Sequence, residues 1–185
     1  MVKDSPPFPK ILSQKWLNHS HLFHVEQLDL RFSNGVERVY ERLNPGAHGA
    51  VMVVPLLDAE TVLLVREYGA GIGQYYVSLP KGAMDAGETP AATANRELKE
   101  EAGYGAKDIS LLTQLSLSPS YMGHRMHILL AQDLYPARLL GDEPEPLEVI
   151  SWPLNKLSEL IARDDFCEAY AVAALLMVKD MLDDD

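Results

Sequence analysis

The sequence is short of cysteine, of positive charge and of long apolar runs. Cys167 is its one cysteine, which excludes an internal disulfide and leads us to expect a cytoplasmic protein. The 16 lysines and arginines are outnumbered by 27 acidic residues, and the resulting net charge of −11 argues against binding to nucleic acid. No apolar run approaches the roughly 18 residues of a membrane-spanning helix, and MVKDSPPFPK lacks the apolar core of a secretion signal. We therefore expect no membrane association.

The 185 residues, 47% of them hydrophobic, are enough for one domain with a sizeable core. We expect a proline-rich extended arm at residues 1–10 and a single domain over 11–185. Partial alternation of apolar and polar residues around Ser33-Asn34-Gly35 predicts an N-terminal hairpin, with strands within 22–43. Further strands are predicted at 51–55, 61–65, 111–118, 127–132 and 148–152, and helices at 155–161 and 166–182.

Residues 82–104, GAMDAGETPAATANRELKEEAGY, predict a helix between two glycine-containing turns. Thr89 is a good N-cap, Pro90 suits the first helical position, and Gly103 is placed to end the helix in a left-handed conformation. One face of this helix is small or apolar and should pack against a sheet: Ala91, Ala94, Leu98 and Ala102.

Glu97, Glu100 and Glu101 line a neighbouring stripe of the same helix, since they lie three and four residues apart. Like charges at this spacing repel each other unless they are solvated or bind a cation. A solvated face is the ordinary explanation, but the surrounding glycine, glutamate and arginine positions favour a metal site. Carboxylate oxygens prefer Mg²⁺ or Mn²⁺ to Zn²⁺. Arg96 lies four residues before Glu100 and can hold a carboxylate through a forked pair of hydrogen bonds.

The spacing of Gly82, Glu88, the run RELKEE at 96–101 and Gly103 resembles the complete Nudix box. Chance would place its seven identities at a given start about once in 10^8 cases. The resemblance implies an α/β fold, a Nudix-type α/β/α sandwich with a mixed sheet and an N-terminal β-hairpin region. It also implies Mg²⁺, with Mn²⁺ as the alternative, bound by Glu97 and Glu101 with Glu100 as third ligand. By the same resemblance Glu88 supports the ligands.

Segments outside the box resemble the ADP-ribose pyrophosphatase branch of the family: VREY at 65–68, LPKG at 79–82, SPSY at 118–121 and GDEPEPL at 141–147. This resemblance implies hydrolysis of small ADP-linked compounds such as ADP-ribose, NADH or diadenosine oligophosphates, with AMP as one product. In that branch the leading hairpins exchange or pair across a homodimer, so we expect a homodimer.

The chain departs from the branch pattern at Gly69, where an arginine is usual, and at Lys81, where alanine is usual. A phosphate held by that arginine in relatives needs another cation here, and Lys81, Arg66 and Arg38 are available. Two aromatic residues are candidates for stacking on adenine: Phe23 and Tyr121. Each of them is also a residue that a strand could bury.

Three glutamates are candidates for the general base. Glu145 comes first because it lies in a proline-flanked loop that could close over the site, and Glu143 comes second. Glu101, acting through water, is a competing assignment. The box does not select the substrate, so coenzyme A, capped RNA or a deoxynucleoside triphosphate stay open, as does a non-catalytic nucleotide sensor.

Overall fold

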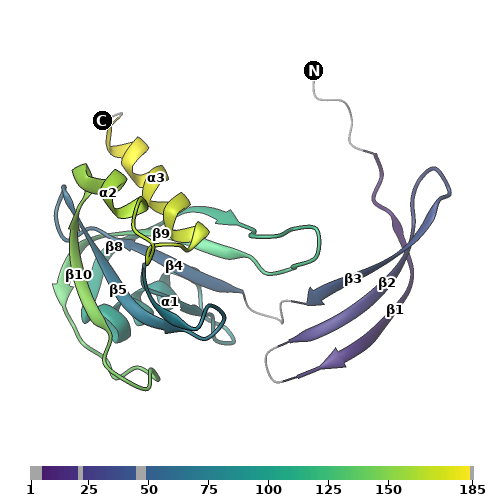
Figure 1. Ribbon diagram of the computed structural model, residues 1–185, viewed down its shortest axis with the longest axis horizontal. Helices are drawn as coiled ribbons and strands as arrows, with labels where there is room; N and C mark the ends of the chain where they lie inside the picture. The colour runs from purple at the N-terminus through teal and green to yellow at the C-terminus, as the bar shows by residue number, and fades with distance from the viewer. Residues whose placement is uncertain (1–5, 21–22, 45–48, 184–185) are drawn as a thin grey trace. The chain divides into compact units, whose positions relative to one another are not determined.

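The computed structural model describes residues 6–20, 23–44 and 49–183, and it separates into two compact units (Figure 1). The N-terminal unit comprises residues 1–47 together with 116–124, and the larger unit comprises 48–115 and 125–185. Among the described helices, none is long and apolar enough to cross a membrane.

The N-terminal unit is an antiparallel sheet in the order β1-β2-β3, formed by β1 (Lys10–His19), β2 (His24–Arg31) and β3 (Glu37–Asn44). The predicted hairpin is confirmed as β2 and β3. Its turn is stabilised by the Asn34 side chain, which accepts from the Val36 N–H at 3.1 Å, and Gly35 adopts a φ of 82° that favours glycine. β1 was not predicted. Residues 1–5 of the predicted arm lie outside the described residues.

Residues 116–124 join the N-terminal unit through main-chain hydrogen bonds. The Leu43 N–H donates to the Tyr121 carbonyl at 2.8 Å, and the Gly123 N–H donates to the Leu43 carbonyl at 3.1 Å. Tyr121 is therefore attached to the end of β3.

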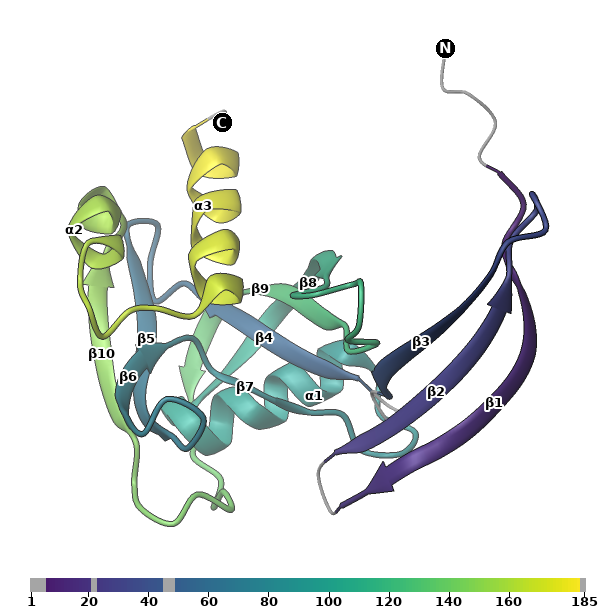
Figure 2. The same cartoon turned by 45° about the vertical axis from the view of Figure 1, so that its right-hand side comes forward.

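The larger unit contains two sheets and its helices (Figure 2). The mixed sheet has the order β7-β4-β9-β8, with β4 and β9 parallel, and consists of β4 (Ala50–Pro55), β7 (Lys81–Ala83), β8 (Tyr104–Leu115) and β9 (Met126–Pro136). The antiparallel sheet has the order β10-β5-β6, from β5 (Thr61–Gly69), β6 (Gln74–Ser78) and β10 (Glu148–Pro153). The helices are α1 (Pro90–Glu97), the π-helical η1 (Leu98–Ala102), the short η2 (Leu154–Lys156), α2 (Leu157–Ile161) and α3 (Ala169–Asp183).

Strand β4 separates two hydrophobic cores. Met52 and Val54 pack in the core that includes α2 and α3, whereas Val51 and Val53 pack in the core that includes α1 and η1. Alternate residues of a strand point to opposite faces, so one strand serves both helical layers. Figure 2 shows α1 and α3 on opposite sides of β4. This is a layered α/β/α arrangement.

The helix of residues 90–102 begins and ends as its sequence predicts. The Thr89 hydroxyl accepts from the Ala92 N–H at 3.2 Å, and Gly103 follows η1 with a φ of 78°. Leu98 and Ala102 are buried, but Ala91 is exposed, so the predicted packing of Ala91 is wrong. The first turn leaves Ala91 facing solvent, and burial starts only at Thr93.

Candidate active site

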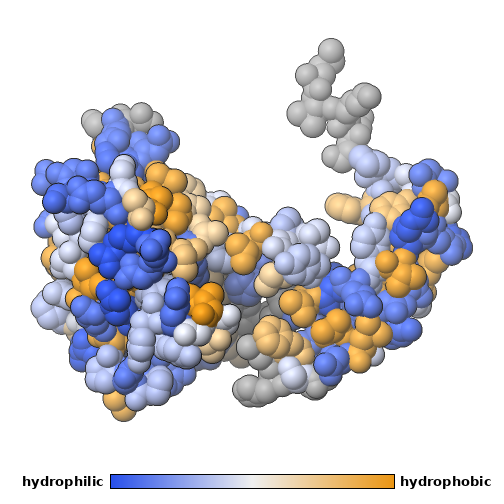
Figure 3. Space-filling model, in the orientation of Figure 1, coloured by the Kyte–Doolittle hydropathy of each residue, from blue (hydrophilic) through white to orange (hydrophobic). Residues whose placement is uncertain are grey.

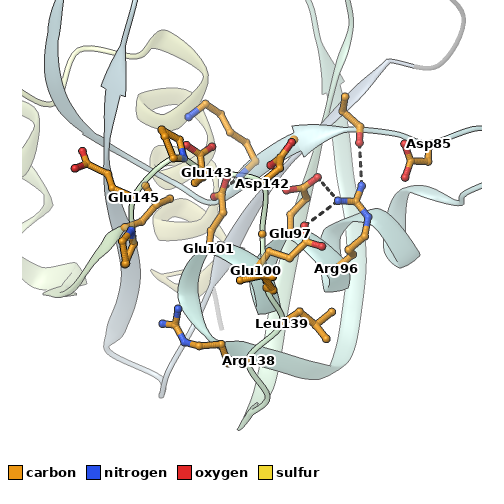
Figure 4. Close-up of a pocket in the computed structure, with 18 residues that line it drawn as sticks. Asp85, Arg96, Glu97, Glu100, Glu101, Arg138, Leu139, Asp142, Glu143 and Glu145 are labelled. Atoms are coloured by element: carbon orange, nitrogen blue, oxygen red, sulfur yellow. Dashed lines mark hydrogen bonds and ion pairs between the residues drawn. The ribbon is translucent and has the colours of Figure 1, made fainter.

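A cleft of about 810 Å³ lies in the larger unit, between the helix of residues 90–102, β7 and the segment 138–147 (Figure 4). Its charged lining consists of seven acidic and three basic residues: Asp85, Glu97, Glu100, Glu101, Asp142, Glu143, Glu145, Lys81, Arg96 and Arg138. This excess of negative charge repels an anion. An anionic ligand therefore needs cations to accompany it.

Arg96 organises the carboxylates on one side of the cleft. Its Nε and Nη2 donate to the two oxygens of Glu88, each at 3.1 Å, while Nη1 donates to Glu97 at 2.7 Å and to Glu100 at 3.0 Å. Nη2 also donates to the Ala83 carbonyl at 3.0 Å. The expected forked pair is thus made with Glu88, and Glu100 receives a single bond. The Arg96 hydrogen bonds, above all, lower the pKa of Glu88 to about 2.

Glu97 and Glu101 are buried carboxyl groups, with only 8% and 7% of each residue exposed. Burial raises the pKa of Glu97 to about 7, against the opposing effect of Arg96. Burial likewise raises the pKa of Glu101 to about 8, against the opposing effect of Lys81. The Glu101 carboxylate accepts from the Lys81 main-chain N–H at 3.1 Å. Two poorly solvated carboxylates therefore lie side by side with too little positive charge to balance them.

Gly82 leaves the space that the Glu97 side chain occupies. A Cβ atom at this position would overlap the Glu97 carboxylate. The main chain at Gly82 therefore comes close to a cleft carboxylate, which a side chain at this position would prevent.

The acidic loop 141–147 places its glutamates differently. Figure 4 shows Glu143 beside Glu101 and Glu145 directed away from both. After burial, the charge of Glu143 is among the causes that raise the pKa of Glu101. The Tyr75 hydroxyl donates to Glu145 instead, and this hydrogen bond raises the pKa of Tyr75. Glu143 is thus the loop glutamate that lies next to buried Glu101.

Residues 46–174 match the NUDIX domain family. The chain belongs to the Nudix family. Residues 9–42 match a second family, the NudE-type Nudix hydrolase N-terminal domain. This Nudix chain is 49% identical to the ADP compounds hydrolase NudE of Escherichia coli (strain K12), with 94% of this chain and 93% of the relative covered. It is 30% identical to the ADP-ribose pyrophosphatase of Bacillus subtilis (strain 168), with 94% and 97% covered.

The fold of this Nudix hydrolase matches a solved structure described as the crystal structure of ADP compounds hydrolase. The TM-score is 0.90 at 48% identity, and 97% of each chain is covered. The predicted Nudix sandwich with its mixed sheet is therefore confirmed, as is the pyrophosphohydrolase class of enzyme.

The Nudix glutamates have the chemistry of a site for a hard divalent ion. Glu97, Glu100 and Glu101 offer carboxylate oxygens on one wall of the cleft, and two of the three are buried with raised pKa values. Over the described ranges, no three acidic, histidine or cysteine side chains already converge as a formed metal site. Arg96 meanwhile binds oxygens of Glu97 and Glu100. The donor set fits Mg²⁺ or Mn²⁺, and Arg96 binds only one oxygen of each of these two carboxylates.

The two predicted phosphate cations of the larger unit both have protein partners. Lys81 forms ion pairs with Glu67 and, at 3.6 Å, with Glu168. Arg66 forms ion pairs with Glu148 at 2.9 Å and with Asp165 at 3.3 Å. Lys81 lines the cleft, whereas Arg66 is absent from its described lining.

The other predicted substrate residues belong to the N-terminal unit. Arg38 lies in β3 and donates to the Glu37 carbonyl at 2.7 Å. Phe23 and Tyr121 are more than half exposed, so neither is buried within its own unit. Their roles in binding phosphate and adenine stay predictions.

Sequence reasoning did not find Glu67, Tyr75 or Glu168. Tyr75 and Glu145 are 70 positions apart, and no local spacing connects such pairs. Asp142 had a visible signal, since it lies in the acidic run GDEPEPL next to the two glutamates chosen there.

Proposed function

We propose that this Nudix hydrolase cleaves the diphosphate of ADP-linked compounds such as ADP-ribose, NADH and diadenosine oligophosphates, with AMP as one product. The observation that carries the proposal is the acidic cleft itself, built around buried Glu97 and Glu101. The identity of 49% with an ADP compounds hydrolase over nearly the full length supports the choice of substrate class. We infer that Mg²⁺ is the ion used, with Mn²⁺ as a substitute.

Glu97, Glu100 and Glu101 would hold the divalent ions. When bound, the metal offsets charge on the diphosphate and promotes ionisation of the attacking water. Arg96 orients Glu97 and Glu100 from behind, because its donors bond to both carboxylates. Its fork with Glu88 keeps the guanidinium in place.

The general base comes from the acidic loop in this proposal. Glu143 is favoured, because it lies beside Glu101, while Glu145 is bonded to Tyr75. Glu145 and Glu101 are the other candidates. The base accepts a proton from the attacking water, which leaves the nucleophile negatively charged as it approaches phosphorus.

Further residues outside the metal site are proposed to bind substrate. Arg38 and Arg66 are proposed phosphate ligands, whereas the Lys81 side chain is already paired with two glutamates. Phe23 and Tyr121 are proposed to stack on adenine, which their exposed rings permit.

We further propose a cytoplasmic homodimer formed through the N-terminal unit. Figure 3 shows hydrophobic residues among the hydrophilic ones on the surface of this unit. Trp16 and Tyr40 are 58% and 44% exposed. Trp16 lies opposite Glu26 of β2, and Tyr40 lies opposite Leu28. Because Glu26 and Leu28 are two residues apart, the two aromatic residues share one face of the sheet. Exposed apolar residues on one sheet face are typical of an interaction surface. The single cysteine, Cys167, supports a reducing compartment.

A substrate panel tests the proposed function. ADP-ribose, NADH, diadenosine triphosphate, coenzyme A and a deoxynucleoside triphosphate are each incubated with Mg²⁺ or Mn²⁺, and the products are separated by ion-exchange chromatography. We expect AMP from the ADP-linked compounds and its loss in Glu101→Gln. Turnover of coenzyme A or the deoxynucleotide alone would show that the proposed substrate class is wrong.

A further inference from the structure

Lys81 lines the cleft, and its ammonium is held among protein groups. It is paired with the Glu67 carboxylate and lies 3.6 Å from that of Glu168, and its Nζ is 5.2 Å from the centre of the Tyr76 ring. The side chains of Lys81, Glu67 and Glu168 are only 17%, 16% and 20% exposed. A phosphate that took Lys81 as its ligand would have to displace carboxylates from a poorly solvated cluster, which is costly.

The cluster connects three parts of the larger unit. Lys81 lies in β7 of the mixed sheet, Glu67 lies in β5 of the antiparallel sheet, and Glu168 immediately precedes α3. Glu168 is itself held by the buried Ser78 hydroxyl, which donates to it at 2.5 Å. One of the two partners of Lys81 is thus held by a further hydrogen bond within the protein.

The main chain of the same residue touches the metal-site carboxylates. The Lys81 N–H donates to Glu101 at 3.1 Å, and the next residue, Gly82, lies against the Glu97 carboxylate. Anchoring the Lys81 side chain therefore limits the movement of the backbone that contacts both Glu97 and Glu101.

We propose that Lys81 is a positioning residue, whose side chain, anchored by Glu67 and Glu168, holds the 80–82 backbone against the Glu97 and Glu101 carboxylates so that they can bind a divalent ion. The inference rests on the proposed function, since it assigns the ion to these two glutamates. It replaces the expectation that Lys81 binds substrate phosphate. The two roles predict different effects of Glu67→Gln. If Lys81 positions the backbone, the substitution removes one anchor of its side chain. If Lys81 binds phosphate, the substitution frees its ammonium for the substrate.

The test compares four variants with the wild type: Lys81→Met, Lys81→Arg, Glu67→Gln and the matched control Lys179→Met, whose lysine pairs with Asp183 on α3. Mn²⁺ affinity is measured by electron paramagnetic resonance without substrate, and kcat and KM for ADP-ribose are measured at saturating Mg²⁺. We expect Lys81→Met to weaken Mn²⁺ binding at least about tenfold and to lower kcat, with KM changed less than about twofold. Glu67→Gln should act in the same direction, Lys81→Arg should restore part of the loss, and Lys179→Met should match the wild type.

Two results would overturn the inference. One is a raised KM in Lys81→Met with Mn²⁺ affinity unchanged, which would identify a phosphate ligand. The other is Mn²⁺ affinity in Glu67→Gln equal to that of the control, which decides the matter even if Lys81→Met does not fold. A wild type that binds Mn²⁺ but hydrolyses no ADP-linked compound would reject the proposed function and leave the Mn²⁺ comparison valid. A wild type that binds no Mn²⁺ would reject both.

Discussion

At the level of single residues, Glu88 shows that a carboxylate outside the proposed metal ligands also has a defined set of hydrogen bonds. Glu88 accepts from Arg96 through both oxygens, from the Thr93 hydroxyl at 2.8 Å and from the Asp85 N–H at 3.1 Å. A carboxylate with four donors is stabilised in its charged form. Glu88 therefore contributes to the stability of the site without contacting the cleft.

The charge of Glu88 should be visible in the pH dependence of stability. Its pKa is about 2 in the folded protein, below the ordinary value of 4.5, so its contribution is present above about pH 4.5 and is lost as pH falls towards 2. We expect Glu88→Gln to lower the free energy of unfolding by about 2 kcal/mol at pH 7. In urea unfolding at pH 7, 4 and 3, this difference should shrink as the pH falls.

The control for Glu88 is Glu37→Gln, because Glu37 pairs with Arg31 while both side chains are more than half exposed. Such a pair contributes less than about 1 kcal/mol. A Glu88→Gln effect that is equally large at pH 3 and pH 7 would contradict the assigned pKa.

Gly82 gives a second test at this scale. In Gly82→Ala the added methyl group must displace the Glu97 carboxylate, and we expect a loss of Mn²⁺ affinity and of kcat of roughly 10- to 100-fold. Gly71→Ala is the matched control, since a Cβ atom there meets nothing within 4 Å. Unchanged Mn²⁺ affinity in Gly82→Ala would show that the position of Glu97 does not matter for the ion.

At the scale of elements, the loop 141–147 and strand β6 together determine where the loop glutamates lie. Tyr75 in β6 binds Glu145, while Glu143 faces Glu101. The loop therefore places one carboxylate beside Glu101 and fastens the other to a neighbouring strand.

This arrangement predicts unequal effects of two matched substitutions. Glu143→Gln should lower kcat by about 10²- to 10⁴-fold at saturating Mg²⁺, while Glu145→Gln should lower it less than about tenfold. Tyr75→Phe should resemble Glu145→Gln, because both variants lose the same hydrogen bond. If Glu145→Gln has the larger effect, the loop rearranges when substrate binds and Glu145 is the base.

At the scale of the whole molecule, the N-terminal unit is a three-stranded sheet with large apolar residues on its surface. A sheet of this size buries little by itself and gains stability when its apolar face is covered. The proposed homodimer covers it with a second copy of the chain.

Trp16→Glu tests the dimer. A charge on this face should favour monomers, because it would have to be buried in the interface. Sedimentation velocity should show a dimer for the wild type and a monomer for Trp16→Glu. The control is Leu176→Glu on α3, which is 50% exposed and belongs to the larger unit. A wild type that sediments as a monomer at micromolar concentration would reject the proposal.

Local sequence was enough to predict the helix of residues 90–102, the spacing of its glutamates and most of the strands of the larger unit. These features depend on neighbours in the chain: a cap at Thr89, a left-handed Gly103, and carboxylates three and four residues apart. The boundaries of β8 and the existence of β1 were missed, because strand formation depends on pairing with distant partners.

Which charged side chains meet depends on how distant parts of the chain pack together. Lys81 has its partners 14 positions earlier at Glu67 and far later at Glu168, and Tyr75 reaches Glu145 across 70 positions. The raised pKa values of Glu97 and Glu101 come first from burial, which no local pattern specifies. Residue spacing defines a helix and its stripe, whereas desolvation and long-range ion pairs arise only when sheets and helices pack together.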